Sequence, residues 1–558
     1  MNARGRAKGG MSMTHVIHSD ILILGGGTAG TMAAIRAREC CPAAKVVVFE
    51  KADIMYSGSI AAGMDAFNVT AVPGFSTPEE YLETAHGACE EIVDDSQCYA
   101  WVSRTWEMVQ KIENWGVIFP KDENGKNIVL DVAPKGKFCL AILEPKLKKI
   151  LAGKVYEMGA TVYNRTMALE LIKKDGRVIG AIGLNVRTGE PIVCMAKAVI
   201  VCAGGTARFG ETTNGYPYGT FDFPGNTGEA YRMAYRAGAK LTGFEYTIVD
   251  YSVKDVNAAG LHISCTRGAY VVDAFGRRVE ENALSISDLL SVHDAGRGPL
   301  RVRMQHLPEQ NIREIEEILF TTERPVQGRF FANRGMDFRK DDIEQWPSEC
   351  FLCGGHGITG VMVNGKAESS VPGLYAAGDA ANVRGFLPGA LVMGGIAAEN
   401  AVEYMADLEA PEYEEALVAE RLAQIEAVKA LRGPVSIQEF ESKLRRTITD
   451  YIAPPKNEYK LSRALEEVQR FDRELKTLVG MQDPEDLFKY FECESIIVSA
   501  FLSAEASRAR KESRWGRFHT RSDYPQRDDV HWKKHVVLEK KDDSDYAVNI
   551  AYQDVERM

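Results

Sequence analysis

Three glycines and one acidic residue near the N-terminus have the types and spacing of a dinucleotide-binding site. They are Gly25, Gly27 and Gly30, with Glu50 following Gly30 by 20 residues. The first glycine of such a motif permits a tight turn, the second lets a pyrophosphate approach the backbone, and the third lets a helix pack closely on a strand. The acidic residue accepts hydrogen bonds from a ribose. We therefore predict that these residues bind the phosphates and a ribose of a dinucleotide.

The segments around these residues have the patterns of a strand, a helix and a second strand. Residues 20–24 and 45–50 are short apolar runs typical of buried parallel strands, and residues 31–39 have a helical pattern. The N-terminus of this helix would offer N–H groups and partial positive charge to the phosphates. Because the strand, glycines, helix, strand and acid occur in this order, a chance glycine-rich loop is a poor explanation. The motif alone does not distinguish FAD from NAD.

Later segments favour FAD. Residues 160–205 have the pattern of a β-meander that returns to the sheet, and residues 373–379 form another strand, glycine and acid unit. Asp379 could bind the ribitol hydroxyls of a flavin, although taken alone it is more typical of a turn. The helix near residues 390–395 could point its N-terminus at the flavin ring. Together with the first unit, these segments indicate a two-part flavin site.

Composition and charge exclude several classes of protein. The chain has 558 residues, 45% of them hydrophobic and 26% charged, which is typical of globular proteins and not of disordered, collagen-like or coiled-coil chains. Lys and Arg number 67 against 78 Asp and Glu, and the net charge of −11 argues against nucleic acid as the main partner. No run approaches the ~18 apolar residues of a spanning helix, so no membrane span is expected.

The cysteines and the N-terminus point to the cytoplasm. The 11 cysteines include the adjacent pair Cys40 and Cys41 but have no regular spacing, so they do not predict a disulfide framework. Reduced thiols are typical of the cytoplasm. The basic N-terminus is not followed by an apolar segment and does not have the pattern of a secretory signal. We expect residues 1–13 to be a flexible tail.

The chain resembles the flavoprotein subunits of the superfamily that contains fumarate reductase, succinate dehydrogenase, L-aspartate oxidase and adenylylsulfate reductase. The resemblance spans roughly residues 18–540. It is carried by segments 25–30 with Glu50, 57–63, 198–205, 227–229 and 373–379, and by a C-terminal signature at 506–514, 519–529 and 532–535.

The resemblance implies an α/β fold with three parts. A Rossmann-like FAD-binding domain is interrupted by an α+β capping domain and followed by a helical C-terminal domain. The expected boundaries are 14–245 and 356–430 for the FAD-binding domain, 246–355 for the capping domain, 431–535 for the helical domain and 536–558 for a C-terminal tail.

The resemblance also implies which residues hold FAD. The expected contacts are Gly25, Gly27, Thr28, Ala29, Gly30, Glu50, Lys51, Ser57, Gly58, Ser59, Gly63, Ala203, Gly204, His356, Gly378, Asp379, Ala390 and Leu391. Succinate dehydrogenases attach the flavin through a histidine in the stretch that corresponds to residues 57–59. This chain has no histidine there, so FAD is expected to be bound non-covalently.

Several residues of the dicarboxylate enzymes are missing. The stretch 244–250 has no histidine, Arg267 and Gly268 lack the neighbouring acid, and Cys350 stands near the place of a second histidine. A succinate or fumarate site needs cationic groups on two carboxylates, so simple fumarate reduction is not expected. Around residues 57–68 and 382–391 the chain is similar to the adenylylsulfate reductase flavoprotein.

That similarity implies a set of catalytic candidates. Asn68 would orient the substrate, and Arg384, Arg301 and Arg267 would bind its charge. Each arginine has another interpretation, because Arg384 could simply pair with a carboxylate, Arg301 could belong to an exposed basic loop, and Arg267 could hold the cap in place. Cys350 and Cys353 form a single C-x-x-C pair, which supplies too few ligands for a zinc or iron–sulfur site.

Three functions are compatible with these residues. In the first, non-covalent FAD exchanges two electrons with a small anionic substrate, and a separate ferredoxin-like iron–sulfur subunit supplies or accepts them, since this chain has no cluster motif of its own. In the second, the chain is a stand-alone flavin oxidase or dehydrogenase. In the third, it is a flavin-binding scaffold whose catalytic site is degraded. We expect an oxidoreductase of the first kind.

Overall fold

The fold is described from a computed structural model. It describes residues 15–558 except for 63–66, 68, 132–137, 141, 143–145, 213–219, 257, 259, 280–285 and 322–325. The expected tail at residues 1–13 lies outside the described residues.

The main sheet contains the first dinucleotide unit. Strands β1 (His15–Leu24), β2 (Val46–Glu50), β5 (Thr161–Asn164) and β8 (Pro191–Val201) pair in parallel in the order β5-β2-β1-β8. The apolar runs expected to be buried strands are buried, since residues 21–24 of β1 and all five residues of β2 fall in the buried class. This confirms the βαβ unit, because α1 (Thr28–Cys40) connects β1 to β2.

The long strand β8 joins the two parts of the flavin site. Its first half pairs antiparallel with the meander of β6 (Thr166–Lys174) and β7 (Arg177–Asn185), and its second half pairs in parallel with β15 (Leu374–Ala376). Residues 374–376 therefore enter the same sheet as residues 21–24, although some 350 positions separate them in the sequence. The carboxyl ends of β1, β8 and β15 meet at one edge of the sheet.

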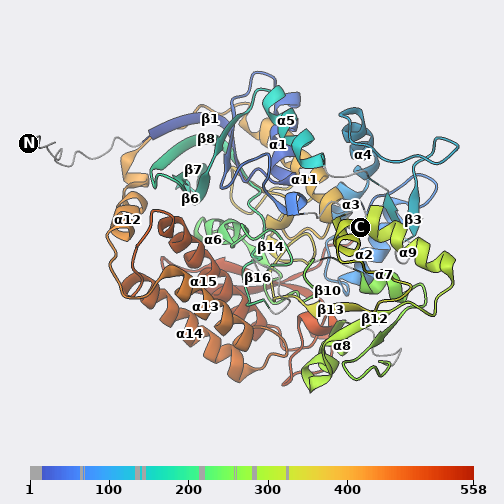
Figure 1. Cartoon of the computed structure of the whole chain (residues 1–558). Coiled ribbons are helices and arrows are strands. Elements are labelled where there is room, and N and C mark those ends of the chain that lie inside the picture. The colour runs from blue at the N-terminus through green and yellow to red at the C-terminus, as the bar shows by residue number, and fades with distance from the viewer. Residues whose placement is uncertain are drawn as a thin grey trace, which may run out of the picture.

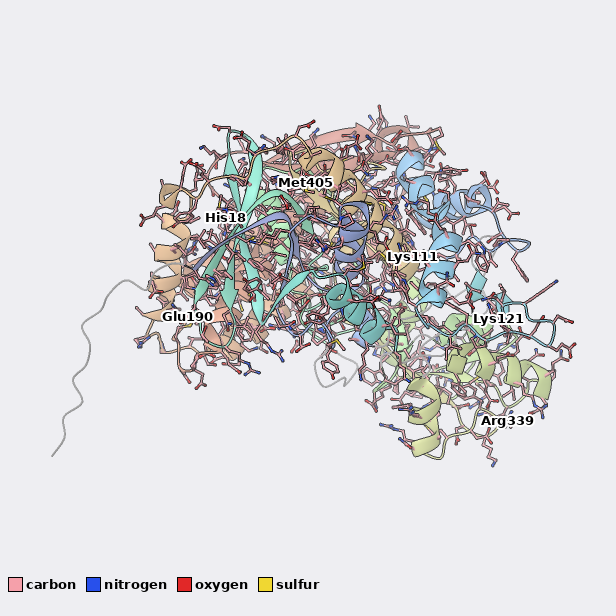
Figure 2. All side chains as sticks on the ribbon, turned by 90° about the horizontal axis from the view of Figure 1, so that it is seen from above. His18, Lys111, Lys121, Glu190, Arg339 and Met405 are labelled. Atoms are coloured by element: carbon pink, nitrogen blue, oxygen red, sulfur yellow. The ribbon has the colours of Figure 1, made fainter. Side chains whose placement is uncertain are left out.

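A second sheet lies at the other side of the molecule. Strands β10 (Tyr251–Val253), β13 (Ile343–Pro347), β12 (Leu300–Arg303) and β11 (Tyr270–Val272) are antiparallel in that order. Helices α7 (Leu261–Cys265), α8 (Ile286–Val292), α9 (Glu309–Thr321) and α10 (Val326–Asn333) accompany this sheet. Figure 2 shows Arg339 of this region far from His18 and Glu190 of the main sheet.

Three long helices follow the second flavin segment. They are α13 (Ile437–Tyr451), α14 (Glu458–Thr477) and α15 (Asp486–Ala509), and they lie together below the main sheet in Figure 1. The segment expected to be a tail is ordered into a hairpin of β16 (Lys534–Lys540) and β17 (Val548–Asp554). Val537 and Leu538 pair with β9 (Leu241–Thr242), because their apolar side chains are buried beside it. This corrects the expectation of a tail at 536–558.

The other described elements complete the fold. The helices are α2 (Pro78–Ala88), α3 (Asp95–Val102), α4 (Thr105–Asn114), α5 (Leu147–Glu157), α6 (Glu229–Arg236), α11 (Phe386–Met405), α12 (Ala419–Lys429) and α16 (Asp529–Trp532), the short helical turns η1 (Ser59–Ala62), η3 (His293–Arg297), η4 (Gly378–Ala380), η5 (Glu415–Leu417) and η6 (Gly516–Phe518), and the strands β3 (Val129–Asp131), β4 (Phe138–Leu140) and β14 (Gly360–Val361). None of the described helices is both long enough and apolar enough to cross a bilayer.

Candidate active site

A cavity of about 890 Å³ lies where the main sheet, the second sheet region and the helical region meet. One end is formed by the glycine-rich loop and the start of α1. The other end is formed by Tyr246, Tyr251, Arg384 and Phe518, together with Gly260, Leu261 and Ile263 of the second sheet region. A cavity of this size and extent fits an extended dinucleotide with room for a small second molecule.

The glycine-rich loop has the shape that a pyrophosphate requires. Gly25 has a φ of +102°, and a Cβ there would lie 2.4 Å from the Cys202 carbonyl oxygen. A Cβ on Gly30 would lie 1.8 Å from the Gly25 oxygen, whereas one on Gly27 would meet nothing closer than 3.9 Å, on the cavity side. Helix α1 begins without a side-chain cap, which leaves its first N–H groups for a ligand. The loop therefore fits the phosphates of FAD.

Glu50 and Lys51 line the cavity but also have partners in the protein. Glu50 accepts hydrogen bonds from the Gly26 and Ala52 N–H groups, both at 2.7 Å, so it supports the loop and still offers lone pairs to a ribose. The ammonium of Lys51 bonds to Glu229 at 2.6 Å and to Glu492 at 2.8 Å. Lys51 thus connects the flavin-binding segment to helix α15.

Asp379 follows β15 and lies in the cavity wall. Its Oδ1 accepts a hydrogen bond from the Gly355 N–H at 3.1 Å. Burial, followed by the nearby carboxylate of Asp222, raises the pKa of Asp379 to about 7. Ligand atoms of Asp222, Cys353 and Asp379 lie within 4.8 Å of one another. Asp379 therefore has a buried, polar environment suited to hydroxyl groups of a ribitol chain.

Arg384 is the cation at the far end of the cavity. Its Nη1 donates to the Tyr246 hydroxyl at 3.1 Å, and the Tyr81 hydroxyl donates to the Arg384 carbonyl oxygen at 3.5 Å. Among the described residues, no carboxylate lies within ion-pair distance of this guanidinium. Arg384 precedes α11, whose first residues Phe386 and Leu387 also line the cavity.

Aromatic side chains surround this end. The His356 ring packs edge-on against Phe221, with centroids 5.6 Å apart, and against Phe386, 5.1 Å apart. The Tyr246 ring lies 5.0 Å from that of Phe518. These rings give the chamber an apolar wall, which excludes water and strengthens any electrostatic contact with Arg384.

The structure does not bring Arg301 and Arg267 into the cavity. Arg301 lies on β12, where Leu300 and Val302 point inward, so its side chain is on the outer face and pairs with Glu344 of β13 at 3.4 Å. Arg267 pairs with Glu314 of α9 at 2.7 Å. Both expectations of a substrate contact are therefore corrected, because each side chain bonds to a carboxylate away from the cavity.

The expected cofactor residues divide into three groups. Those that line the cavity are Gly25, Gly27, Thr28, Ala29, Glu50, Lys51, Gly58, Ser59, Ala203, Gly204, His356, Gly378, Asp379 and Ala390. Gly30, Ser57 and Leu391 lie behind the wall. Ser57 has a buried hydroxyl for which the described part of the chain offers no hydrogen-bond partner. Gly63 and the catalytic candidate Asn68 lie outside the described residues.

Sequence reasoning missed several residues at the site. Tyr246 and Phe518 come from segments about 270 positions apart, and Lys148 reaches the glycine-rich loop from α5. Arg517 has a buried Nε with no hydrogen-bond partner among the described residues. Arg517 and Phe518 lie between the segments 506–514 and 519–529 of the C-terminal signature, so that signature was the nearest available signal.

Helix α11 reaches the cavity as expected, but it begins earlier than its pattern indicates. The sequence predicts a helix only near residues 390–395, whereas α11 starts at Phe386 and Ala390 lies in its second turn against the cavity. Pro388 and two glycines at the start of α11 are residues that are unfavourable in a helix interior, so the sequence there does not indicate a helix. Proline is nevertheless well tolerated in the first turn of a helix.

Comparison with known proteins identifies the family. Residues 20–391 match the model of the FAD binding domain, and residues 441–558 match the model of the fumarate reductase flavoprotein C-terminus. A fumarate reductase flavoprotein subunit of Mycobacterium tuberculosis is 24% identical over 95% of this chain and 96% of its own length. An FAD-dependent oxidoreductase of Methanocaldococcus jannaschii, described as uncharacterized, is 25% identical over 94% and 96%.

Solved structures show the same fold. Adenylylsulfate reductase of Archaeoglobus fulgidus superposes with a TM-score of 0.85 at 23% identity, covering 98% of this chain and 97% of its own. The flavoprotein of Escherichia coli quinol fumarate reductase superposes with a TM-score of 0.82 at 18% identity, covering 98% of both chains. With the match over residues 20–391 and the loop geometry above, this chain belongs to the FAD-binding oxidoreductases of the fumarate reductase and succinate dehydrogenase flavoprotein family.

Proposed function

We propose that this FAD-dependent oxidoreductase exchanges two electrons with a small anionic substrate held at Arg384. One observation carries the proposal: Arg384 lines the cavity, and among the described residues its side chain bonds to the Tyr246 hydroxyl and the Cys89 thiol and to no carboxylate. A guanidinium stays protonated in proteins. Burying its charge without a counter-ion is costly, so an anionic ligand in the chamber would offset that cost.

The other residues of the site have defined parts in this proposal. The glycine-rich loop and the start of α1 hold the pyrophosphate, Glu50 holds the ribose, and Asp379 holds the ribitol chain. FAD, when bound, supplies the two-electron chemistry. The aromatic wall of Phe221, Phe386 and Phe518 keeps water from the substrate end. Because no attachment histidine occurs at residues 57–59, we propose that FAD is held by these contacts alone.

The missing residues and the structural neighbours favour a sulfur anion as substrate. The stretch 244–250 lacks histidine, and Arg301 and Arg267 are engaged elsewhere, so a second carboxylate would have few cationic contacts. One structural neighbour, adenosine-5-phosphosulfate reductase, was solved as a covalent adduct with sulfite at a TM-score of 0.86. We propose sulfite and adenylylsulfate as the first substrates to test.

We further propose that a separate iron–sulfur subunit supplies or removes the electrons. The sequence has no cluster-binding cysteine motif. Several relatives are named as flavoprotein subunits, including those of the succinate dehydrogenase of Coxiella burnetii and the 8-methylmenaquinol:fumarate reductase of Wolinella succinogenes. Purification from the native cells tests this: a stoichiometric ferredoxin-like chain is expected. A chain purified alone that releases peroxide with a substrate favours the stand-alone oxidase.

The Arg384→Met variant tests the substrate site. Reduced viologen would serve as electron donor for the reduction assays and ferricyanide as electron acceptor for the oxidation assays, with sulfite, adenylylsulfate and fumarate as the compounds screened. Loss of the guanidinium is expected to reduce kcat/KM at least ~100-fold, about 2.7 kcal/mol of transition-state stabilisation, with FAD content unchanged.

The matched control is Arg301→Met, which removes an arginine that faces away from the cavity. It is expected to change kcat/KM less than twofold. Equal activity of the Arg384 variant and the wild type would remove Arg384 from the substrate site.

A further inference from the structure

A buried lysine lies directly behind the glycine-rich loop. Lys148 is the second residue of α5 and only 4% of its surface is exposed. Its ammonium donates a hydrogen bond to the Gly26 carbonyl oxygen. Lys148 does not line the cavity, and neither the dinucleotide motif nor the family resemblance pointed to it.

Gly26 is held through both of its backbone polar groups, which belong to two successive peptide groups. Its N–H donates to Glu50 Oε2 at 2.7 Å, and its carbonyl oxygen accepts from Lys148. Gly26 lies between Gly25, which makes the tight turn, and Gly27, which leaves space for the phosphates. The Gly26 carbonyl and the Gly27 N–H belong to one planar peptide group, here called the Gly26 peptide, so the bond from Lys148 also fixes the direction of the Gly27 N–H.

We propose that Lys148 is a positioning residue that sets the affinity for FAD, by holding the Gly26 peptide and by placing a positive charge behind the pyrophosphate. Lys51, the cation that follows Glu50 in the cavity wall, is already bound to Glu229 and Glu492. The ammonium of Lys148 supplies a further positive charge behind the loop. Its hydrogen bond to the Gly26 carbonyl oxygen polarises that peptide group, so the N–H on the other side carries more positive charge toward the phosphates. The inference depends on FAD binding and not on the substrate proposed above.

The environment of Lys148 makes this contribution sensitive to pH. Burial lowers the pKa of Lys148 to about 8, although the nearby carboxylates of Glu50 and Asp53 act in the opposite direction and raise it. In the described part of the chain, the charged groups that shift the pKa of Lys148 are these two carboxylates, one at the end of β2 and one just after it. A bound pyrophosphate adds negative charge and raises this pKa again. FAD binding is then linked to proton uptake wherever free Lys148 is deprotonated.

The sign of this linkage gives a definite expectation. Below about pH 8 the lysine is protonated in both states, so the FAD affinity does not depend on its titration. Above about pH 8, binding must take up a proton, so the dissociation constant rises with pH by at most tenfold per pH unit.

The experiment measures FAD dissociation from the full-length holoenzyme. Free FAD is separated by ultrafiltration between pH 6.5 and 9.5 and quantified by fluorescence. In Lys148→Met the dissociation constant is expected to rise about tenfold or more at pH 7, and its dependence on pH above 8 is expected to disappear. Lys148→Arg keeps the charge, so it is expected to remain within threefold of the wild type at pH 7 and to lose the rise above pH 8.

The control is Lys149→Met on the same helix. Lys149 is exposed, and its ammonium lies 5.4 Å from the Tyr56 ring, away from the loop. Its FAD affinity and pH profile are expected to match the wild type. An unchanged affinity in Lys148→Met, or a pH dependence retained there, overturns the proposal. If Lys148→Met does not fold, the wild-type protein still tests the proposal. An FAD dissociation constant of the wild type that does not change between pH 7 and 9.5 would by itself overturn it.

Discussion

Single residues show how burial changes the chemistry of an ordinary side chain. Glu349 is 1% exposed and accepts the Phe221 N–H with one oxygen, while its Oε2 has no hydrogen-bond partner among the described residues. Burial raises the pKa of Glu349 to about 8, although the Phe221 N–H opposes the shift. At neutral pH this carboxyl is therefore protonated in the folded protein.

Glu349→Gln is expected to stabilise the protein in a pH-dependent way. Between about pH 4.5 and 8 the unfolded chain is ionised at this position and the folded chain is not, so folded stability falls as the pH rises. The glutamine removes this effect and should increase the free energy of unfolding by on the order of 2–4 kcal/mol at pH 7.5, with little change near pH 4.5. Urea denaturation at both pH values measures it, and equal effects at the two would contradict it.

At the scale of elements, the flavin site depends on the close packing of α1 against α11. A Cβ on Gly394 would lie 2.3 Å from the Ala29 carbonyl oxygen, so only a glycine allows this approach. Ala29 and Ala390 line the cavity from the two helices. The distance between the helices therefore determines the width of the site.

Gly394→Val is expected to lose most of its FAD, because the added side chain separates α11 from α1. The ratio of flavin to protein absorbance after purification measures this. Gly395→Ala is the matched control, since its Cβ would meet nothing closer than 3.9 Å. It should retain FAD and gain up to about 1 kcal/mol of stability from helix propensity. Normal FAD content in the valine variant would show that α11 can move without loss of the site.

At the scale of the whole molecule, buried charges connect the flavin-binding part to the helical part. Glu492 of α15 bonds to Lys51 at 2.8 Å and to Arg208 at 2.8 Å, and both cations also line the cavity. Although burial opposes its ionisation, Arg208 and Lys51 lower the pKa of Glu492 to about 2. The stability that this carboxylate contributes is present above about pH 4.5 and is lost as the pH falls toward 2.

Glu492→Gln should therefore destabilise the protein at neutral pH by about 3 kcal/mol, the free energy that corresponds to the lowered pKa. Lys51 and Arg208 lose their shared partner, and each keeps one other carboxylate, Glu229 and Glu441. The difference from the wild type should shrink as the pH approaches 3. Thermal unfolding across this pH range measures it. Glu485→Gln is the control: its pair with Arg187 is exposed, and its effect should stay within about 0.5 kcal/mol. A loss of stability that is the same at pH 3 and pH 7 would rule out the ion pairs as its cause.

The sequence by itself determined the parts of the site that local patterns encode. The turn at Gly25, the helix after it and the acid at Glu50 follow from backbone sterics and hydrophobic periodicity within about 30 residues. The meander and the strand before Asp379 were predicted for the same reason. The family, its flavin and its enzyme class also followed from short motifs.

Only the tertiary structure decided which distant side chains meet. Arg384 faces the cavity, whereas Arg301 and Arg267 form ion pairs with carboxylates away from it. The direction of each side chain depends on the strand face or the helix contact that holds it. Lys148 reaches the Gly26 carbonyl oxygen from a helix more than one hundred positions away in the sequence. Residues 534–554 form a hairpin that pairs with β9, which lies almost three hundred positions earlier. Such contacts form where burial of apolar surface and pairing of charges are best satisfied together, and a linear pattern does not contain that information.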